Sequence, residues 1–209
     1  MISHDRGLFF FSPIFLLSIV GFIMASRKKE NYWLPILLVF LADLLFYASF
    51  DDPWGGWGFG PRYLIPTLPL LAIMVGRAFD FLLEKGLLIQ IVIYILTLYS
   101  TGIALMGALT TNAIPPSVEV VISRAPDNFI VNWNYLVSGR SSSFIYNTVF
   151  KSLIPSLVYF YIIFVIISAY LATIFFVKTK KKRSEAEEDS DKIQKYLHQE
   201  GKFTDLQVR

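Results

Sequence analysis

The chain contains runs of apolar residues long enough to cross a lipid bilayer. Leu153–Val177 is the clearest of them, because it holds no charged side chain and stops at Lys178. A membrane-spanning helix needs about 20 mostly apolar residues. The composition agrees: 55% of the 209 residues are hydrophobic and only 17% are charged, whereas a soluble domain carries about a quarter charged residues. An ordinary soluble enzyme and a disordered protein are therefore excluded, and an all-α integral membrane protein is predicted.

Five transmembrane helices are predicted, and the third has the weakest pattern. Its apolar part contains Pro66 and Pro69 and is followed by Arg77 and Asp80. These two charged residues are three apart, so they share a helix face and are expected to form an ion pair. The predicted spans are about 8–25, 32–50, 63–83, 87–109 and 153–177, with outer loops at 51–62 and 110–151.

Lys and Arg residues set the predicted orientation, because they accumulate on the cytoplasmic side of membrane proteins. With the C-terminal tail inside, ten of these residues lie in inner segments and five in outer ones. The membrane domain is then residues 1–177, and residues 178–209 form a cytoplasmic tail that is basic at first and then acidic. Five spans place the N-terminus outside. A chain that starts outside and enters a hydrophobic helix at once is expected to be the C-terminal part of a longer protein.

Several classes of chemistry are excluded by what the sequence lacks. There is no Cys, which removes thiolate metal sites, thiol catalysis and disulfides. No P-loop, zinc-protease helix motif or nucleophile elbow is present. The net charge of +3 needs no nucleic acid to explain it, because most Lys and Arg residues lie at predicted membrane boundaries. No cofactor and no metal site is predicted.

The most unusual segment reads WGGWGFGPRYLIP and runs from Trp54 to Pro66. Four glycines in seven residues are incompatible with a stable helix, and they let backbone N–H groups approach a ligand closely. Arg62 adds a guanidinium that can bind a phosphate bidentately. The segment fits two interpretations, an anion-binding site in the outer leaflet or a Gly-rich turn with interfacial aromatic residues. The residues concerned are Gly55, Gly56, Gly58 and Gly60, with Trp54, Trp57, Phe59 and Tyr63 as aromatic surfaces for a sugar or a lipid head region.

Three carboxylates raise further hypotheses. Asp51 and Asp52 precede the Gly-rich segment and are weak candidates for a general base or a divalent-cation site, the alternative being a solvated loop. Asp43 lies in the middle of the second predicted span, where a charge is costly and is a functional hypothesis by default. Structural pairing of Asp43 is an equally good explanation.

In the second outer segment, rich in Asn, Ser and Pro, short helices on the membrane surface are expected.

Two strings resemble patterns in a known family. The strings are DRGLFFFSP (Asp5–Pro13) and WGGWGFGPRYLIPTLP (Trp54–Pro69). Their order and spacing are similar to those in the C-terminal halves of prokaryotic C-type (GT-C) membrane glycosyltransferases, which are related to the dolichyl-phosphate-mannose protein mannosyltransferases. The resemblance covers residues 5–71, and beyond them only hydropathy supports it.

The resemblance implies sugar transfer from a polyprenyl-phosphate carrier at the extracytoplasmic face of a prokaryotic cell membrane. Arg62, with Arg6 as a second positive residue, is the implied contact for the lipid phosphate. The carboxylate base of such enzymes lies in the first outer loop of the full protein, and no part of this chain corresponds to that loop. The chain is therefore expected to carry the lipid-phosphate half of a site, completed by a missing N-terminal half or a partner subunit. The alternatives are a non-enzymatic membrane subunit that binds lipid carrier or a partner, and a small transporter.

Overall fold

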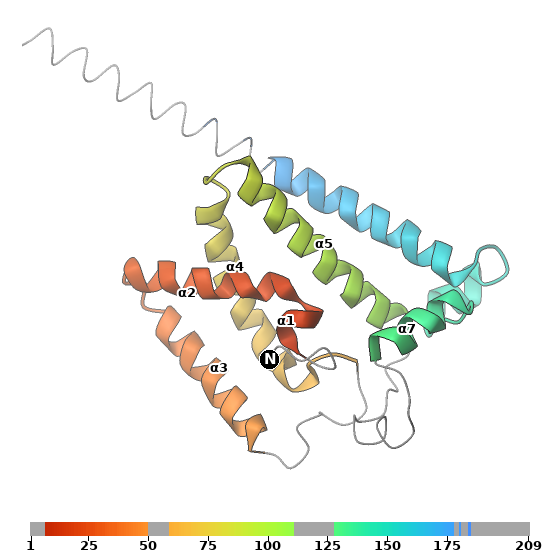
Figure 1. Cartoon of the computed structure of the whole chain (residues 1–209), viewed down its shortest axis with the longest axis horizontal. Coiled ribbons are helices and arrows are strands. Elements are labelled where there is room, and N and C mark those ends of the chain that lie inside the picture. The colour runs from red at the N-terminus through yellow and green to blue at the C-terminus, as the bar shows by residue number, and fades with distance from the viewer. Residues whose placement is uncertain (1–6, 50–58, 111–127, 178–179, 181–183, 185–209) are drawn as a thin grey trace, which may run out of the picture. The chain divides into compact units, whose positions relative to one another are not determined.

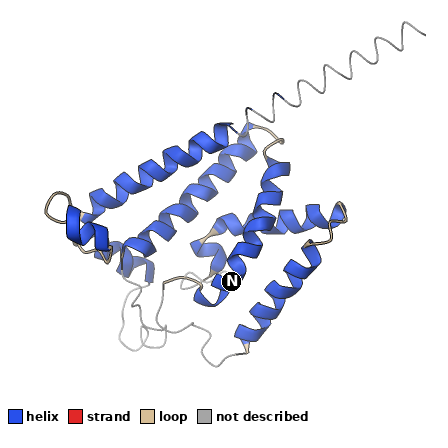
Figure 2. Cartoon of the chain, turned by 180° about the vertical axis from the view of Figure 1, so that it is seen from behind, coloured by secondary structure: helices blue, strands red, loops and turns tan. Residues whose placement is uncertain are grey.

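The computed structural model describes residues 7–49, 59–110 and 128–177, together with residues 180 and 184. All regular structure in these residues is helical (Figure 2). Residues 1–168 and 169–209 are two separate compact units. The elements are α1 (Leu8–Phe11), η1 (Pro13–Leu16), α2 (Leu17–Arg27), α3 (Trp33–Ala48), η2 (Arg62–Thr67), α4 (Leu68–Leu82), α5 (Leu87–Leu109), α7 (Asn128–Val137), the π-helical turn η3 (Tyr146–Phe150), and the helix Ser156–Val177 (Figure 1).

Three helices in the described part of the chain are long and apolar enough to cross a membrane. They are Arg62–Leu82, which joins η2 to α4, then Leu87–Leu109 and Ser156–Val177. Their length and composition indicate an integral membrane protein. The third predicted span, whose pattern was the weakest, is among them. Its prolines are tolerated because Pro66 falls in the 3₁₀ turn and Pro69 in the first turn of α4, where a missing N–H costs little.

The prediction of one unbroken helix over residues 8–25 is wrong. The chain leaves the helical conformation at Ser12, where φ is −145° and ψ is 71°, and it resumes as η1 and then α2. The residue before a proline is disfavoured in the helical region, so Pro13 accounts for the break. The apolar helices Pro13–Arg27 and Trp33–Ala48 are both shorter than a full span. The structure thus supports three of the five predicted spans at full length.

Helix α2 packs closely against α4 (Figure 1). Gly21 and Ala25, one turn apart on α2, are both buried there, and a Cβ atom on Gly21 would overlap the backbone of Met74. Ala25, Met74 and Ala78 have no exposed surface. Small residues spaced four apart let two helix backbones approach in this way.

Helix α5 runs alongside the first part of the helix Ser156–Val177 (Figures 1 and 2). The Tyr94 hydroxyl donates to the backbone oxygen of Ser168 at 3.2 Å. A Cβ atom on Gly102 would lie 3.3 Å from the Phe164 ring. These two contacts hold α5 against residues 164–168 of that helix.

The second outer segment holds short helices, as predicted, within its described residues. Helix α7 packs on the end of α5, and buried hydrogen bonds hold the two together. The Thr110 hydroxyl donates to the side chain of Asn132, which has no exposed surface. The Ser141 hydroxyl donates to the Leu109 carbonyl at 2.6 Å, and the Ser156 hydroxyl donates to the Leu136 carbonyl at 2.7 Å. Buried polar groups that are satisfied in this way fix one arrangement of the segment.

Candidate functional site

The two sequence strings lie in contact. The Phe11 ring, from the first string, meets the Phe59 ring, from the second, edge to face with centroids 4.9 Å apart. Gly60 follows with φ of +81°, a conformation that favours glycine, and a Cβ atom there would lie 3.4 Å from Phe11. A cavity of about 170 Å³ lies between the strings and α5, and Leu8, Ser12 and Pro61 contribute to its walls.

Two contacts with α5 hold these strings in position. A Cβ atom on Gly107 would overlap the Phe59 ring, so the ring lies directly on the helix backbone. The backbone N–H of Ile14, in the first turn of η1, donates to the hydroxyl of Ser100 at 3.2 Å. The first N–H groups of a helix have no partner within the helix, so this bond satisfies one of them. Phe59, predicted as a sugar or lipid-head contact, is half-buried in this packing.

A tight turn precedes Arg62. The Arg62 N–H donates to the Gly60 carbonyl at 2.9 Å across Pro61, whose φ of −80° and ψ of 68° are those of an inverse γ-turn. The Arg62 side chain is exposed at the start of η2. Pro61 before Arg62 and Ile65 after it line the cavity, and Arg62 itself is not among the lining residues.

Tyr63 stacks on Tyr47, with ring centroids 4.5 Å apart and ring planes within 5°. One face of the Tyr63 ring is thus covered by α3. Tyr47 was not identified from the sequence. Its signal was its spacing of four residues from Asp43, which places both side chains on one face of α3.

Asp43 has a hydrogen-bond partner within the described fold. The hydroxyl of Thr67, which is buried, has two acceptors within reach, the Leu64 carbonyl at 3.0 Å and an Asp43 carboxylate oxygen at 3.5 Å, and its one hydrogen is shared between them. This contact joins α3 to η2 next to the stacked tyrosines. It supports the structural-pairing explanation of Asp43.

Arg77 forms an ion pair with Glu30, a partner that was not predicted from the sequence. The Arg77 Nε–H donates to Glu30 at 3.1 Å, and its Nη2 contacts the other carboxylate oxygen. The Tyr32 hydroxyl also donates to Glu30. Hydrogen bonds from Tyr32 first, and from Arg77, hold the pKa of the Glu30 carboxyl below its ordinary value. The α2–α3 turn is thereby tied to α4.

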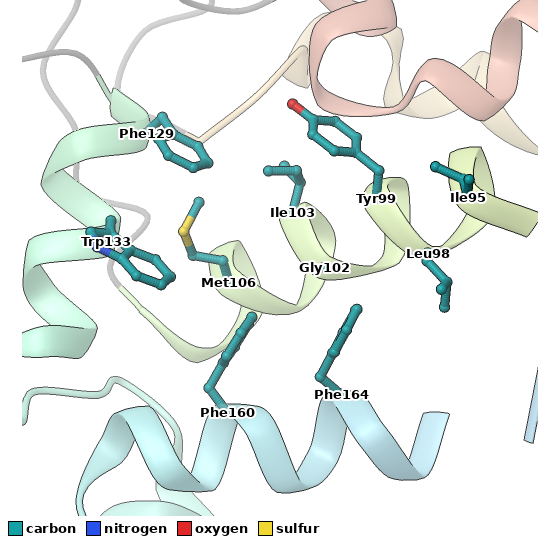
Figure 3. A pocket seen from close by; sticks show the side chains of 10 residues that line it. All are labelled: Ile95, Leu98, Tyr99, Gly102, Ile103, Met106, Phe129, Trp133, Phe160 and Phe164. Carbon is teal, nitrogen blue, oxygen red and sulfur yellow. The ribbon is translucent and has the colours of Figure 1, made fainter. Parts of the chain in front are cut away.

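A second, larger hollow lies between α5, α7 and the helix Ser156–Val177 (Figure 3). This apolar groove has a volume of about 320 Å³. Its walls carry Phe129 and Trp133 from α7, and Phe160 and Phe164 point into it from the last helix (Figure 3). The groove was not predicted, because three segments that are distant in sequence form it. The pattern of each segment by itself indicates only side chains that face lipid or pack against other helices.

Several predicted site residues lie outside the described part of the chain. They are Arg6, Asp51, Asp52, Trp54, Gly55, Gly56, Trp57 and Gly58. Their roles stay predictions. Among the described residues, no group of His, Asp and Glu side chains has the arrangement of a metal site. Comparisons with protein-family models, with curated proteins and with solved structures gave no match.

Proposed function

We propose that this chain is the C-terminal membrane portion of a C-type glycosyltransferase and binds a polyprenyl-phosphate-linked sugar at the extracytoplasmic face. One observation carries the proposal: the two strings on which the family resemblance rests are in contact through Phe11 and Phe59.

In this proposal Arg62 binds the lipid phosphate. A guanidinium forms two parallel hydrogen bonds with phosphate oxygens, and such charge-assisted bonds are the strong ones. Trp54, Trp57, Phe59 and Tyr63 contact the sugar or the lipid head, and Arg6 supplies a second positive charge. The general base that deprotonates the acceptor comes from a longer chain or from a partner subunit.

The proposed topology has five membrane passes, with the N-terminus outside and the tail in the cytoplasm. The two shorter apolar helices, Pro13–Arg27 and Trp33–Ala48, are the first two passes. A helix of 16 residues is about 24 Å long, so each of these passes needs flanking residues or a locally thinner bilayer to reach both interfaces. Arg62 then lies on the outer side, where the carrier presents its sugar.

The test is binding of an undecaprenyl phosphate to the purified full chain in lipid nanodiscs. A hydrogen bond to a charged group contributes about 1.5–3 kcal/mol, so Arg62→Ala is expected to weaken binding roughly ten- to hundredfold. Arg62→Lys keeps the charge but loses the bidentate geometry, so its affinity should lie between those of the unchanged chain and Arg62→Ala. Arg140→Ala, at another exposed arginine, is the matched control. Equal affinity of Arg62→Ala and the unchanged chain would remove the phosphate role.

A further inference from the structure

Arg62 lies in a short stretch of chain that an aromatic ring anchors at each end. Before it, the Phe59 ring lies so close to the α5 backbone that a Cβ atom on Gly107 would overlap it. After it, the Tyr63 ring stacks on Tyr47 of α3 with centroids 4.5 Å apart. The two anchors are thus on different helices, and Arg62 lies between them in the chain.

Two hydrogen bonds hold the backbone between the anchors. The N–H of Arg62 donates to the Gly60 carbonyl at 2.9 Å, across Pro61, whose ring restricts its own φ angle. The N–H of Leu64 donates to the Pro61 carbonyl at 3.0 Å in the first turn of η2. The guanidinium is therefore carried by a backbone that is held on both sides of Arg62.

The contact between α3 and η2 has a regular register. Asp43 and Tyr47 are four residues apart on α3, and Tyr63 and Thr67 are four apart on η2. Tyr47 stacks on Tyr63, and an Asp43 carboxylate oxygen lies 3.5 Å from the Thr67 hydroxyl. The two elements thus run antiparallel and meet at two points. The ring stack is the larger contact, because the Thr67 hydrogen is shared with the Leu64 carbonyl.

We infer that Tyr47 is a positioning residue for Arg62, because its ring holds Tyr63 against α3 and thereby fixes the direction in which the guanidinium leaves η2. This role rests on the proposed function, in which Arg62 binds the lipid phosphate. Two parallel hydrogen bonds to a phosphate require a defined orientation of the guanidinium plane. A backbone that is fixed before the ligand arrives loses less freedom on binding, which raises the affinity. Tyr47 lies outside both sequence strings, so α3 takes part in the carrier site.

Binding of undecaprenyl phosphate in nanodiscs to Tyr47 variants is the first test. Tyr47→Leu removes the ring, so the start of η2 has to be ordered when the phosphate binds. Fixing the backbone of one residue changes an equilibrium constant about five- to thirtyfold, and the affinity should fall by that factor. Tyr47→Phe keeps the ring and should rescue the affinity. Tyr170→Leu, the same substitution at a tyrosine that is 66% exposed, is the matched control.

A positioning residue acts through the residue that it positions, and a double-mutant cycle detects this dependence. In an Arg62→Ala chain, Tyr47→Leu should cause no further loss of affinity, because no guanidinium is left to orient. An equal loss in both backgrounds would mean that Tyr47 contacts the lipid itself or only supports the fold. Either of these meanings overturns the positioning role.

Spin labelling measures the mobility of η2 without any carrier. The chain contains no cysteine, so Ile65→Cys provides a single site for a nitroxide. Ile65 is 56% exposed and lies three residues after Arg62, on the same face of the 3₁₀ helix. The label should be motionally restricted in the chain with Tyr47 and in Tyr47→Phe, and more mobile in Tyr47→Leu.

The outcomes distinguish a failure of this inference from a failure of the proposed function. An Arg62→Ala chain with full affinity for the carrier removes the phosphate role, and the role of Tyr47 with it. Weak binding by Arg62→Ala together with full affinity of Tyr47→Leu overturns the role of Tyr47 alone. A label at position 65 that is already mobile with Tyr47 in place also overturns it, and this measurement does not depend on the folding of Tyr47→Leu.

Discussion

Phe11 and Phe59 meet edge to face, 4.9 Å between ring centroids, although two helices, α2 and α3, separate them along the chain. Phe11 is 3% exposed. Truncation of a buried Phe costs about 3–5 kcal/mol, so Phe11→Ala should strongly destabilise the chain in denaturant unfolding in detergent. Phe144→Ala, at a residue that is 80% exposed, should have little effect.

The pairing itself can be measured with a double-mutant cycle. An aromatic pair contributes about 0.5–1.5 kcal/mol beyond its buried area. The summed losses of unfolding free energy in Phe11→Leu and Phe59→Leu should therefore exceed the loss in the double variant. Additive losses would mean that the two rings do not interact in solution.

The close crossing of α2 and α4 predicts opposite effects for two glycines. Gly21→Ala forces a Cβ atom into the Met74 backbone, and overpacking of this kind costs about 1–3 kcal/mol. Gly76→Ala, in α4 with open space at its Cβ position, should be neutral or stabilising by up to about 1 kcal/mol, because alanine is the better helix former. Thermal unfolding of the two variants in the same detergent compares them, and a Gly21→Ala chain as stable as the unchanged one would contradict the crossing.

The Glu30–Arg77 contact predicts a pH-dependent contribution to stability. The folded pKa of Glu30 lies below its ordinary value of 4.5, with the Tyr32 hydrogen bond as the largest cause. A carboxyl with a lowered folded pKa stabilises the fold above its unfolded pKa and loses that contribution as the pH falls through the folded value. Glu30→Gln should therefore lower the Tm at pH 7 and match the unchanged chain in acid.

The control for that prediction is Glu84→Gln, which alters an exposed carboxylate after α4. It should give a smaller Tm change than Glu30→Gln at pH 7. A Tm difference for Glu30→Gln that stays constant from pH 7 to well below 4.5 would show that the contact does not depend on the charge of Glu30.

The contact between Thr67 and Asp43 separates structural pairing from transport. Thr67→Val removes the donor and should cost about 0.5–1.5 kcal/mol, the range for a typical hydrogen bond, because the Asp43 carboxylate is only half-buried. Asp43→Asn keeps an acceptor oxygen for Thr67 and should cost less. Denaturant unfolding measures both. An Asp43→Asn chain that is as stable as the unchanged one, but loses ion or solute flux in vesicles, would favour the transporter alternative.

Local patterns predicted much of the helical framework. Helix α5 has the predicted bounds, Leu87–Leu109, because it is uncharged throughout and bounded by Gly86. The break at Ser12 was not predicted from the apolar run, although a residue before a proline is disfavoured in the helical conformation. The pattern of the third span was the weakest because of its prolines, yet Pro69 is harmless in the first turn of a helix.

Contacts between distant segments could not be predicted from the sequence. Asp80 was the expected partner of Arg77, because it is the carboxylate nearest to Arg77 in the sequence. The fold brings Glu30, from the turn between α2 and α3, to Arg77. The apolar groove depends on the packing of three segments, and no one of them carries a signal for it. The two strings were recognised from their composition and order, but their contact through Phe11 and Phe59 required the fold.

The most direct test of the central claim is photolabelling by a diazirine-bearing undecaprenyl phosphate. The full chain is labelled in membranes, digested and mapped by mass spectrometry. We expect labelling in the peptides that contain residues 8–13 and 59–66, with strong loss in Arg62→Ala and little change in Arg140→Ala. Labelling spread over lipid-facing residues such as Leu153, with no dependence on Arg62, would contradict a carrier site between the two strings.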